Sequence, residues 1–276
     1  MELSMLDNFH KHRKAIIAEK VRALVEAQFF AHHPKFRNTV SIIVHGSVAH
    51  DRYDAHSDVD LEVIAHDERD LPRLVDYVKL WKRERGHARL QIHMPTSILS
   101  VRQRLEDWQY DAVLRTYAKA LIIHDPRGAF AKMQRSFAWY PAPILREKMH
   151  WLFAEAVFLL AERYPVAVKR KDPFYPHVLT LEIVRYLMQA LLMANKQFPA
   201  FDKHLFAEVR DLPALPAAII RQIRTLLTEE PHSFDDLEAC VALVEAYLVK
   251  RKALPKLSRE AWLALRPKQR VDIAMK

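Results

Sequence analysis

The chain has 276 residues, of which 50% are hydrophobic and 28% are charged, and its formal net charge is +9. This composition is that of a globular protein, and the length suffices for one large domain or two modest ones. The single cysteine, Cys240, excludes an intramolecular disulfide and fits a reducing, cytoplasmic setting. We expect neither a secretory signal nor a membrane-spanning window, and the basic charge favours anionic partners such as nucleotide phosphates.

The first half of the chain predicts alternating helices and strands. Apolar positions at helical spacing run from about Leu6 to Phe30. Four short apolar stretches, each ended by a turn, predict strands at 39–47, 58–65, 87–95 and 120–126. Helices are expected between them at 71–86 and at 95–120, the second with Thr96 or Ser97 as its N-cap.

After Gly128 the pattern is helical, and no further strand is expected. Prolines separate four segments with helical periodicity, at 144–164, 176–197, 213–227 and 234–252. The fold class we predict is therefore α+β. A domain with a small mixed sheet flanked by helices covers residues 1–135, and an all-α bundle with a basic tail covers residues 136–276.

The stretch from Val44 to Asp67, VHGSVAHDRYDAHSDVDLEVIAHD, holds one of only three glycines in the chain. Gly46-Ser47 follows a predicted strand, where a glycine allows a phosphate to approach the backbone and a hydroxyl can bind it. Asp58 and Asp60 lie two residues apart on a strand, so their side chains point to one face, with Val59, Leu61 and Val63 on the other. The alternative is a tight turn followed by an exposed acidic strand.

This stretch resembles the signature of the DNA polymerase beta-type nucleotidyltransferase superfamily. That signature is an apolar strand, Gly-Ser, a spacer, and then Ser-Asp-apolar-Asp-apolar. It is matched here by Gly46, Ser47, Ser57, Asp58, Val59, Asp60 and Leu61. The helical bundle that follows is similar to the small-molecule branch, the aminoglycoside- and lincosamide-type nucleotidyltransferases.

The resemblance implies a nucleotide site around the Gly-Ser turn. Gly46, Ser47 and Ser57 are expected to hold the phosphates of a nucleoside triphosphate, taken to be ATP. Many relatives carry Arg-Gly in the spacer, whereas this chain has His50-Asp51 there. We expect Arg52 to supply the positive charge and His50 to touch a phosphate, while His45, His56 and His66 are expected to face solvent or phosphate.

The resemblance also implies that Asp58 and Asp60 bind Mg²⁺ or Mn²⁺ and carry the catalysis. Relatives place a third carboxylate on the strand after the intervening helix. On that strand this chain has Gln91 and His93 on the corresponding face. Imidazole favours softer ions than Mg²⁺. Glu62, Gln91 and His93 are therefore the candidate third ligands, although strand rise puts Glu62 roughly 6–7 Å beyond Asp60.

A general base can also come from the helical domain in the small-molecule branch. Glu155, which lies among apolar residues on a predicted helix, is the candidate for that role. The alternative for Glu155 is an ordinary acidic side chain on a helix surface. A positioned general base typically contributes about 10²–10⁴ in rate.

These expectations describe an enzyme, a metal-dependent nucleotidyltransferase. It would transfer a nucleoside monophosphate to a hydroxyl of a small acceptor held between the two domains. One alternative is a catalytically weak or inactive module that binds nucleotide or RNA, and another is a toxin–antitoxin nucleotidyltransferase that modifies a protein or a tRNA. Nucleic acid is the less favoured partner, and no membrane partner is expected.

Overall fold

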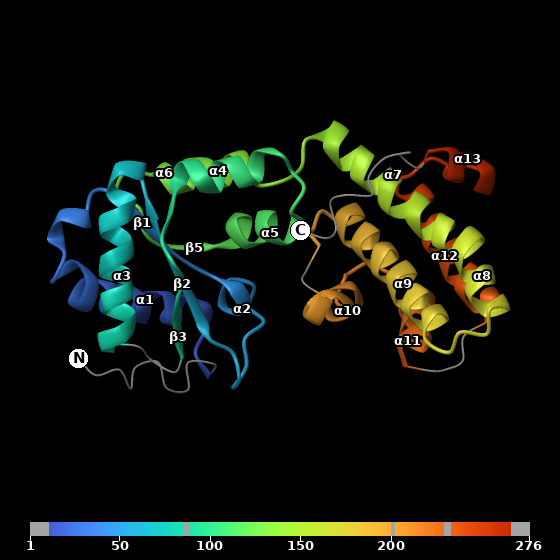
Figure 1. Cartoon of the computed structure of the whole chain (residues 1–276), viewed down its shortest axis with the longest axis horizontal. Helices are drawn as coiled ribbons and strands as arrows, with labels where there is room; N and C mark the ends of the chain where they lie inside the picture. Colours follow the sequence, from blue (N-terminus) through green and yellow to red (C-terminus); the bar gives the residue numbers. More distant parts are fainter. Residues whose placement is uncertain (1–10, 86–88, 200–201, 229–232, 266–276) are drawn as a thin grey trace. The chain divides into compact units, whose positions relative to one another are not determined.

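The computed structural model describes residues 11–85, 89–199, 202–228 and 233–265. The chain divides into two compact units, Met1–Trp139 and Tyr140–Lys276 (Figure 1). A small mixed sheet and its helices form the first unit, and the described part of the second is helical. The fold class is therefore α+β, as the sequence predicts.

The first unit is built on a five-stranded sheet. Its order is β3-β2-β1-β5, and the short β4 also pairs with β2. Strand β1 is antiparallel to β2 and β5, whereas β2 is parallel to β3 and β4. The strands are β1 Val40–His45, β2 Val59–Ala65, β3 Leu90–Ile92, β4 Thr96–Ser97 and β5 Leu121–His124.

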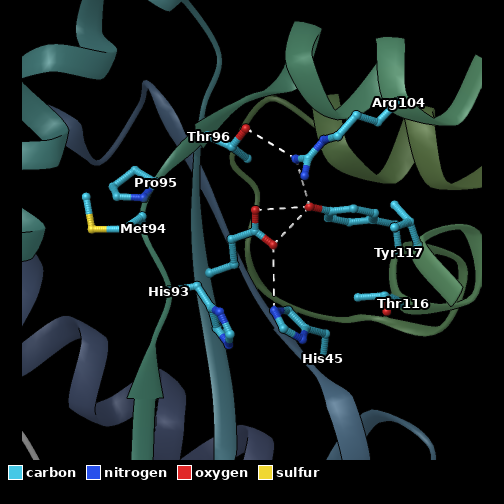
Figure 2. A pocket seen from close by; sticks show the side chains of 10 residues that line it. His45, His93, Met94, Pro95, Thr96, Arg104, Thr116 and Tyr117 are labelled. Atoms are coloured by element: carbon cyan, nitrogen blue, oxygen red, sulfur yellow. Dashed lines mark hydrogen bonds and ion pairs between the residues drawn. The ribbon is translucent and has the colours of Figure 1, made fainter. Parts of the chain in front are cut away.

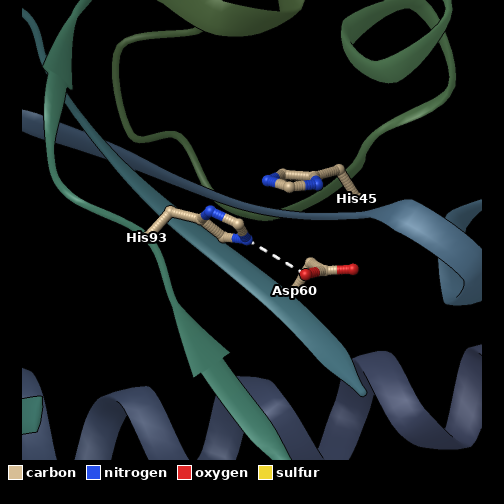
Figure 3. Close-up of side chains that lie close together, drawn as sticks. All are labelled: His45, Asp60 and His93. Atoms are coloured by element: carbon tan, nitrogen blue, oxygen red, sulfur yellow. Dashed lines mark hydrogen bonds and ion pairs between the residues drawn. The ribbon is translucent and has the colours of Figure 1, made fainter. Parts of the chain in front are cut away.

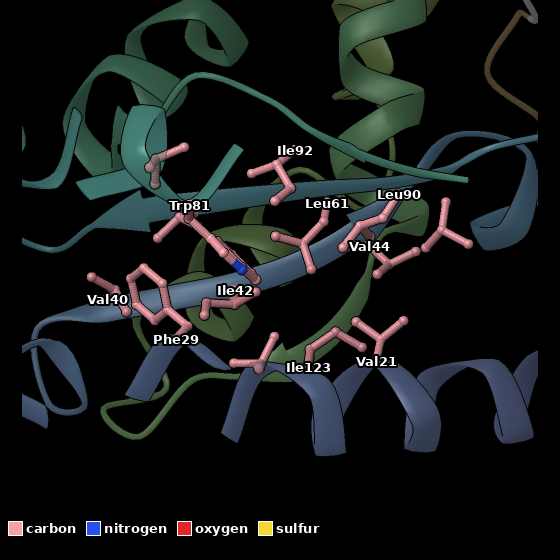
Figure 4. Close-up of a cluster of buried hydrophobic side chains, with 14 of the residues drawn as sticks. Val21, Phe29, Val40, Ile42, Val44, Leu61, Trp81, Leu90, Ile92 and Ile123 are labelled. Carbon is pink, nitrogen blue, oxygen red and sulfur yellow. The ribbon is translucent and has the colours of Figure 1, made fainter. Parts of the chain in front are cut away.

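One face of this sheet carries the hydrophobic core of the first unit (Figure 4). Val44 lies opposite Leu61 in the register of β1 and β2. Helix α1 (Lys14–Leu24), the π-helical turn Val25–Phe30 and helix α3 (Leu71–Arg85) contribute buried side chains to it, among them Val21, Phe29 and Trp81. Fully burying one such side chain contributes about 1.5–3 kcal/mol. The predicted apolar face of β2 is confirmed.

The opposite face of the same strands carries polar side chains. His45 lies opposite Asp60, and Ile43 lies opposite Glu62. Asp60 is also in register with Gln91 of β3. Because side chains alternate between the two faces of a strand, the acidic residues of β2 point away from the core. This face positions the candidate site.

The prediction of a single helix at 95–120 is wrong. This segment forms β4, then helix α4 (Ile98–Glu106), then helix α5 (Asp111–Lys119). Trp108, between the two helices, has a φ of 57°, a left-handed conformation that an α-helix cannot continue through. Ser97 is the N-cap of α4, because its Oγ accepts a hydrogen bond from the Ser100 amide at 3.0 Å.

Two other expected elements differ in length. The first helix begins at Lys14, and residues before 11 lie outside the described part. The strand expected at 87–95 is shorter in the structure, where it is β3. Residues 87 and 88 also lie outside the described part of the chain. The remaining short elements of this unit are the 3₁₀ turns Pro34–Phe36 and Glu68–Asp70, α2 Gly46–Ala49 and α6 Ala129–Ser136.

The second unit is a set of helices, and its described residues include no strand. Its first helix runs through a π-helical turn, Leu159–Arg163, and the tail beyond residue 265 lies outside the described part. The helices are α7 Ala142–Phe158, α8 Tyr164–Lys169, α9 Tyr175–Ala194, α10 Asp202–Arg210, α11 Ala217–Thr228, α12 Phe234–Lys250 and α13 Arg259–Ala264.

The expectation that no stretch of the sequence is long and apolar enough to span a bilayer is wrong for helix α9. It is the one described helix that is long and apolar enough, by length and composition, to cross a membrane. However, 56% of its apolar window is buried inside the structure. Ile183, Leu187 and Leu191 are among its fully buried residues, so packing in the helical unit accounts for the apolar character.

Candidate functional site

The turn after β1 depends on Gly46, whose φ is +67°. A Cβ at this position would lie 2.0 Å from Oδ2 of Asp60 and 3.0 Å from its Cγ. Non-glycine residues are strained at such a φ, and the contact leaves no room for a side chain. The glycine turn and the carboxylate of β2 therefore form one packed unit.

His45, Asp60 and His93 form a cluster around this turn (Figure 3). Each offers one ligand atom, and these atoms all lie within 4.8 Å of one another. His93 Nε2 is 3.0 Å from Asp60 Oδ1, and the two imidazole rings have centroids 4.7 Å apart. The His45 side chain is 12% exposed and that of His93 is 35% exposed, so the cluster is open at His93.

Burial lowers the pKa of His45 from 6.5 to about 4. The Asp60 carboxylate opposes this shift in pKa, and His93 adds to it. His45 is consequently neutral at pH 7. A neutral imidazole keeps a lone pair on one ring nitrogen, as a metal ligand requires.

Glu62 lies next to this cluster and is contacted by His45 and Tyr117. Figure 2 labels these two residues together with Arg104, which bonds to Tyr117. The Tyr117 hydroxyl donates to its two carboxylate oxygens, at 3.1 and 3.2 Å, and accepts from Arg104 Nη2 at 3.2 Å. His45 Nε2 is 3.6 Å from Glu62 Oε2. Burial raises the pKa of Glu62, and the hydrogen bond from Tyr117 opposes the rise. Burial, together with the charge of Glu62, also raises the pKa of Tyr117.

These groups line a cavity of about 690 Å³, a volume typical of small-molecule sites. Its lining mixes charged, hydroxyl and apolar side chains from β1, β2, the β3–β4 connection, β4, α4 and α5. The lining residues are His45, Glu62, His93, Met94, Pro95, Thr96, Arg104, Val113, Thr116 and Tyr117.

The structure brings four of the five predicted nucleotide-binding residues into one turn. Gly46 and Ser47 begin α2, His50 follows it directly, and the Arg52 amide donates to the Ser47 carbonyl at 2.9 Å. Ser57 belongs to a separate turn before β2. Its hydroxyl donates to the carboxylate of the exposed Asp54 and accepts from the Asp54 amide, both at 3.0 Å. Nucleotide contact by these residues stays a prediction.

The residues predicted for the metal separate into two groups. Asp60 and His93 lie in the cluster, whereas Asp58 precedes β2 by one residue, is partly exposed, and is not in the three-residue cluster. Glu62 is engaged with Tyr117, and Gln91 is exposed on β3. In the described part of the chain, the side chains that lie with Asp60 are thus the imidazoles of His45 and His93.

Glu155 lies on α7 in the second unit and is partly buried. Burial raises the pKa of the nearby Tyr186, and the charge of Glu155 adds to that rise. Its role as a general base stays a prediction.

The sequence interpretation missed His45 and the cavity residues of α4 and α5. His45 and His66 were expected to face solvent or phosphate, but their side chains are only 12% and 6% exposed. The alternation of β1 indicates that Ser41, Ile43 and His45 share a face. No turn signal fixes which residue of β2 lies opposite His45, because a 13-residue connection joins the two strands.

Comparison with known proteins adds two findings. A family model described as Domain of unknown function (DUF4037) matches residues 109–205, which run from just before α5 into α10 and exclude the turn at Gly46. No curated protein matches the chain.

The second finding concerns solved structures. The chain is similar to the crystal structure of a nucleotidyltransferase-like protein from Exiguobacterium sibiricum 255-15. The sequence identity is 13%, the TM-score is 0.48, and the match covers 84% of this chain and 75% of that chain.

Proposed function

We propose that this protein is a nucleotidyltransferase that depends on a divalent metal. It would move a nucleoside monophosphate from a nucleoside triphosphate, ATP first, to a hydroxyl of a small acceptor. The observation that carries the proposal is the contact between Gly46 and Asp60. The glycine of the Gly-Ser motif and the second aspartate of the Asp-x-Asp motif pack against each other, as a shared site for phosphate and metal requires.

The chain's own residues would do most of the positioning. The bare Cα of Gly46 allows a phosphate to approach the backbone, and the Ser47 hydroxyl and Arg52 offer donors to its oxygens. Mg²⁺ or Mn²⁺ at Asp60 would offset the charge of the phosphates when bound. Phosphoryl-group chemistry of this kind rests mainly on positioning and electrostatics.

The cavity beside the cluster is the acceptor site that we favour. Arg104 and Thr96 offer hydrogen-bond donors to a hydroxylated molecule. The Thr116 hydroxyl donates to the Ala112 carbonyl, so its oxygen is available as an acceptor. Glu62 is the carboxylate that lines this cavity in the described part of the chain. Since burial raises its pKa, Glu62 is better matched to taking up a proton near neutral pH than an exposed glutamate is. It therefore joins Glu155 as a candidate base.

Nucleotide binding tests the proposal directly. We expect one or more of the four common nucleoside triphosphates to raise the unfolding temperature by several degrees with Mg²⁺ or Mn²⁺, and not in EDTA. Asp60→Asn should abolish this rise. Asp76→Asn, the same charge change at an exposed position of α3, should retain it. If no triphosphate stabilises the wild-type chain with either metal, the proposal fails.

The acceptor requires a separate experiment. Incubation of the chain with labelled ATP and cell extract should yield a labelled small molecule. A labelled tRNA or protein would instead identify the toxin–antitoxin type of transferase. Nucleotide binding without any labelled product would identify a binding module. Asp60→Asn is the negative control for each product.

A further inference from the structure

The donor atoms of the cluster differ from those that Mg²⁺ prefers. Mg²⁺ takes hard oxygen ligands in near-octahedral geometry, whereas His45 and His93 offer two imidazole nitrogens against one carboxylate of Asp60. Imidazole suits Zn²⁺, Fe²⁺, Ni²⁺ and Cu²⁺, and two histidines with one carboxylate form a known ligand set for Zn²⁺ and Fe²⁺. We infer that His45, Asp60 and His93 form a site for a first-row transition-metal ion and discriminate against Mg²⁺.

The distances are those of a site that needs little rearrangement. Two ligands bound to one ion, each at about 2.1 Å, are about 3.0 Å apart at right angles and about 3.4 Å apart at tetrahedral angles. His93 Nε2 and Asp60 Oδ1 are 3.0 Å apart. The largest separation among the three ligand atoms is no more than 4.8 Å, so His45 would close on the ion by a small side-chain movement.

Three neighbouring strands hold the ligands in place. His45 and Asp60 are direct partners in the register of β1 and β2. The His93 amide donates to the Leu61 carbonyl at 2.8 Å, which fixes the backbone of His93 one residue after β3. Ligands on paired strands lose little freedom on binding, which favours a preorganised site.

Glu62 supplies the outer partner that a histidine ligand commonly has. Its Oε2 is 3.6 Å from His45 Nε2, and Tyr117 holds the carboxylate from the other side. Coordination through His45 Nδ1 would leave the Nε2 proton directed at this carboxylate, an arrangement that orients the ring and raises its basicity. The three protein ligands leave positions on the ion open to water or phosphate.

The inference refines the metal of the proposed function, but it is tested without nucleotide. Chelator-treated full-length chain is titrated with Zn²⁺, Co²⁺, Mn²⁺ and Mg²⁺ in a calorimeter. We expect one site per chain, with affinity falling from Zn²⁺ through Co²⁺ to Mn²⁺ and with Mg²⁺ weakest. The absorption spectrum of the Co²⁺ form should show ligand-field bands. This measurement uses the wild-type chain, so it does not depend on whether a variant folds.

Variants assign the site to these residues. Asp60→Asn, His93→Gln and His45→Gln should each weaken Zn²⁺ binding at least about tenfold, the loss typical when even an orienting partner of a ligand is removed. His56→Gln is the matched control, because His56 is an exposed histidine in the connection between β1 and β2. This variant should bind Zn²⁺ as the wild type does. His93→Asp, which replaces nitrogen by oxygen, should narrow the preference for Zn²⁺ over Mg²⁺.

Two results would overturn the inference. One is Mg²⁺ binding as tightly as Zn²⁺, and the other is Zn²⁺ affinity in the three cluster variants equal to that of the wild type. Failure of the proposed function looks different. In that case the transition metals bind as described, but no nucleoside triphosphate stabilises the chain with any metal.

Discussion

Two histidine–aspartate pairs lie at opposite ends of the polar face of the sheet, and they have different surroundings. At one end His66 Nε2 and Asp125 Oδ1 are 3.9 Å apart, with the Ser41 hydroxyl bonded to both. At the other end His93 Nε2 and Asp60 Oδ1 are 3.0 Å apart, beside Gly46. The residue types are the same, so the partners of each carboxylate decide what the pair does.

The Asp125 carboxylate is satisfied by the fold. It accepts from the Ser41 hydroxyl at 2.8 Å and from the amides of Phe130 and Ala131 at 3.4 and 2.9 Å. The Ser41 oxygen also lies 2.8 Å from His66 Nε2. The Asp125 side chain is 4% exposed, so this pair ties β1 and β2 to the start of α6. Its role is structural.

The Asp60 carboxylate has a different environment. Its side chain is 21% exposed, and the hydrogen bond found for it comes from the side chain of His93. One of its oxygens faces the bare Cα of Gly46. Asp125, which backbone amides hold, therefore stabilises the fold, whereas Asp60, which another side chain holds, keeps the capacity to bind a ligand.

The largest expected effect comes from removing each charge in turn. Asp125→Asn should lower the free energy of unfolding by about 2–4 kcal/mol, because charge-assisted bonds are lost and an amide group faces two backbone donors. Asp60→Asn, measured in EDTA, should change it by no more than about 1 kcal/mol. Urea unfolding of both variants gives the two changes in unfolding free energy. Equal losses would contradict the assignment of Asp125 to the fold and of Asp60 to ligand binding.

Each aspartate also has a glycine with positive φ beside it, which allows a matched pair of variants. Gly128 has a φ of 64°, but a Cβ added there would meet nothing within 4 Å, so Gly128→Ala should cost about 1 kcal/mol. Gly46→Ala adds the clash with Asp60 and should cost about 2–3 kcal/mol. Urea unfolding of the two variants measures the difference.

The double variant Gly46→Ala/Asp60→Ala tests the origin of that difference. If the clash is the cause, removing the Asp60 carboxylate should recover part of the loss in unfolding free energy. Additive losses would show that the clash contributes nothing.

The smallest expected effect is a pH dependence at the structural pair. Burial lowers the pKa of His66 below 6.5, Arg127 and His124 lower this pKa further, and Asp125 opposes them. The folded state then binds fewer protons than the unfolded state just below pH 6.5, so stability should fall as pH drops through 6.5. Between pH 7 and 5, the urea midpoint of His66→Gln should fall less steeply than that of the wild type. An identical dependence of the midpoint on pH in the two chains would contradict this.

Much of the first unit was predictable because alternation fixes the faces of a strand. Alternation alone places Val59, Leu61 and Val63 on the core face, and Asp60 and Glu62 on the other. His93 was predicted to share the face of Asp60 for the same reason. Period-two patterns are local, so they require no knowledge of the topology.

The rest of the site depends on contacts between residues distant in sequence. The pairing of His45 with Asp60 follows from a register across a long connection, and Tyr117 reaches Glu62 across 55 residues. The contact between Tyr117 and Glu62 was not predicted, because one continuous helix was expected at 95–120. The break in that helix occurs at Trp108, which has a positive φ although it is neither a glycine nor a proline. The order of strands in the sheet was likewise beyond a local pattern.

The alternation along β2 has a consequence for how this chain tolerates insertions. Val59, Leu61 and Val63 are fully buried in the core, while Asp60 and Glu62 point toward the cluster and the cavity. One residue added before Asp60 would turn every following side chain of β2 to the other face, with carboxylates entering the core and valines entering the cavity. Insertions at this strand therefore cannot alter the site and spare the fold. Within the preceding connection, residues 54–56 are exposed and lie outside both the core and the cluster, so a change of length there avoids both penalties.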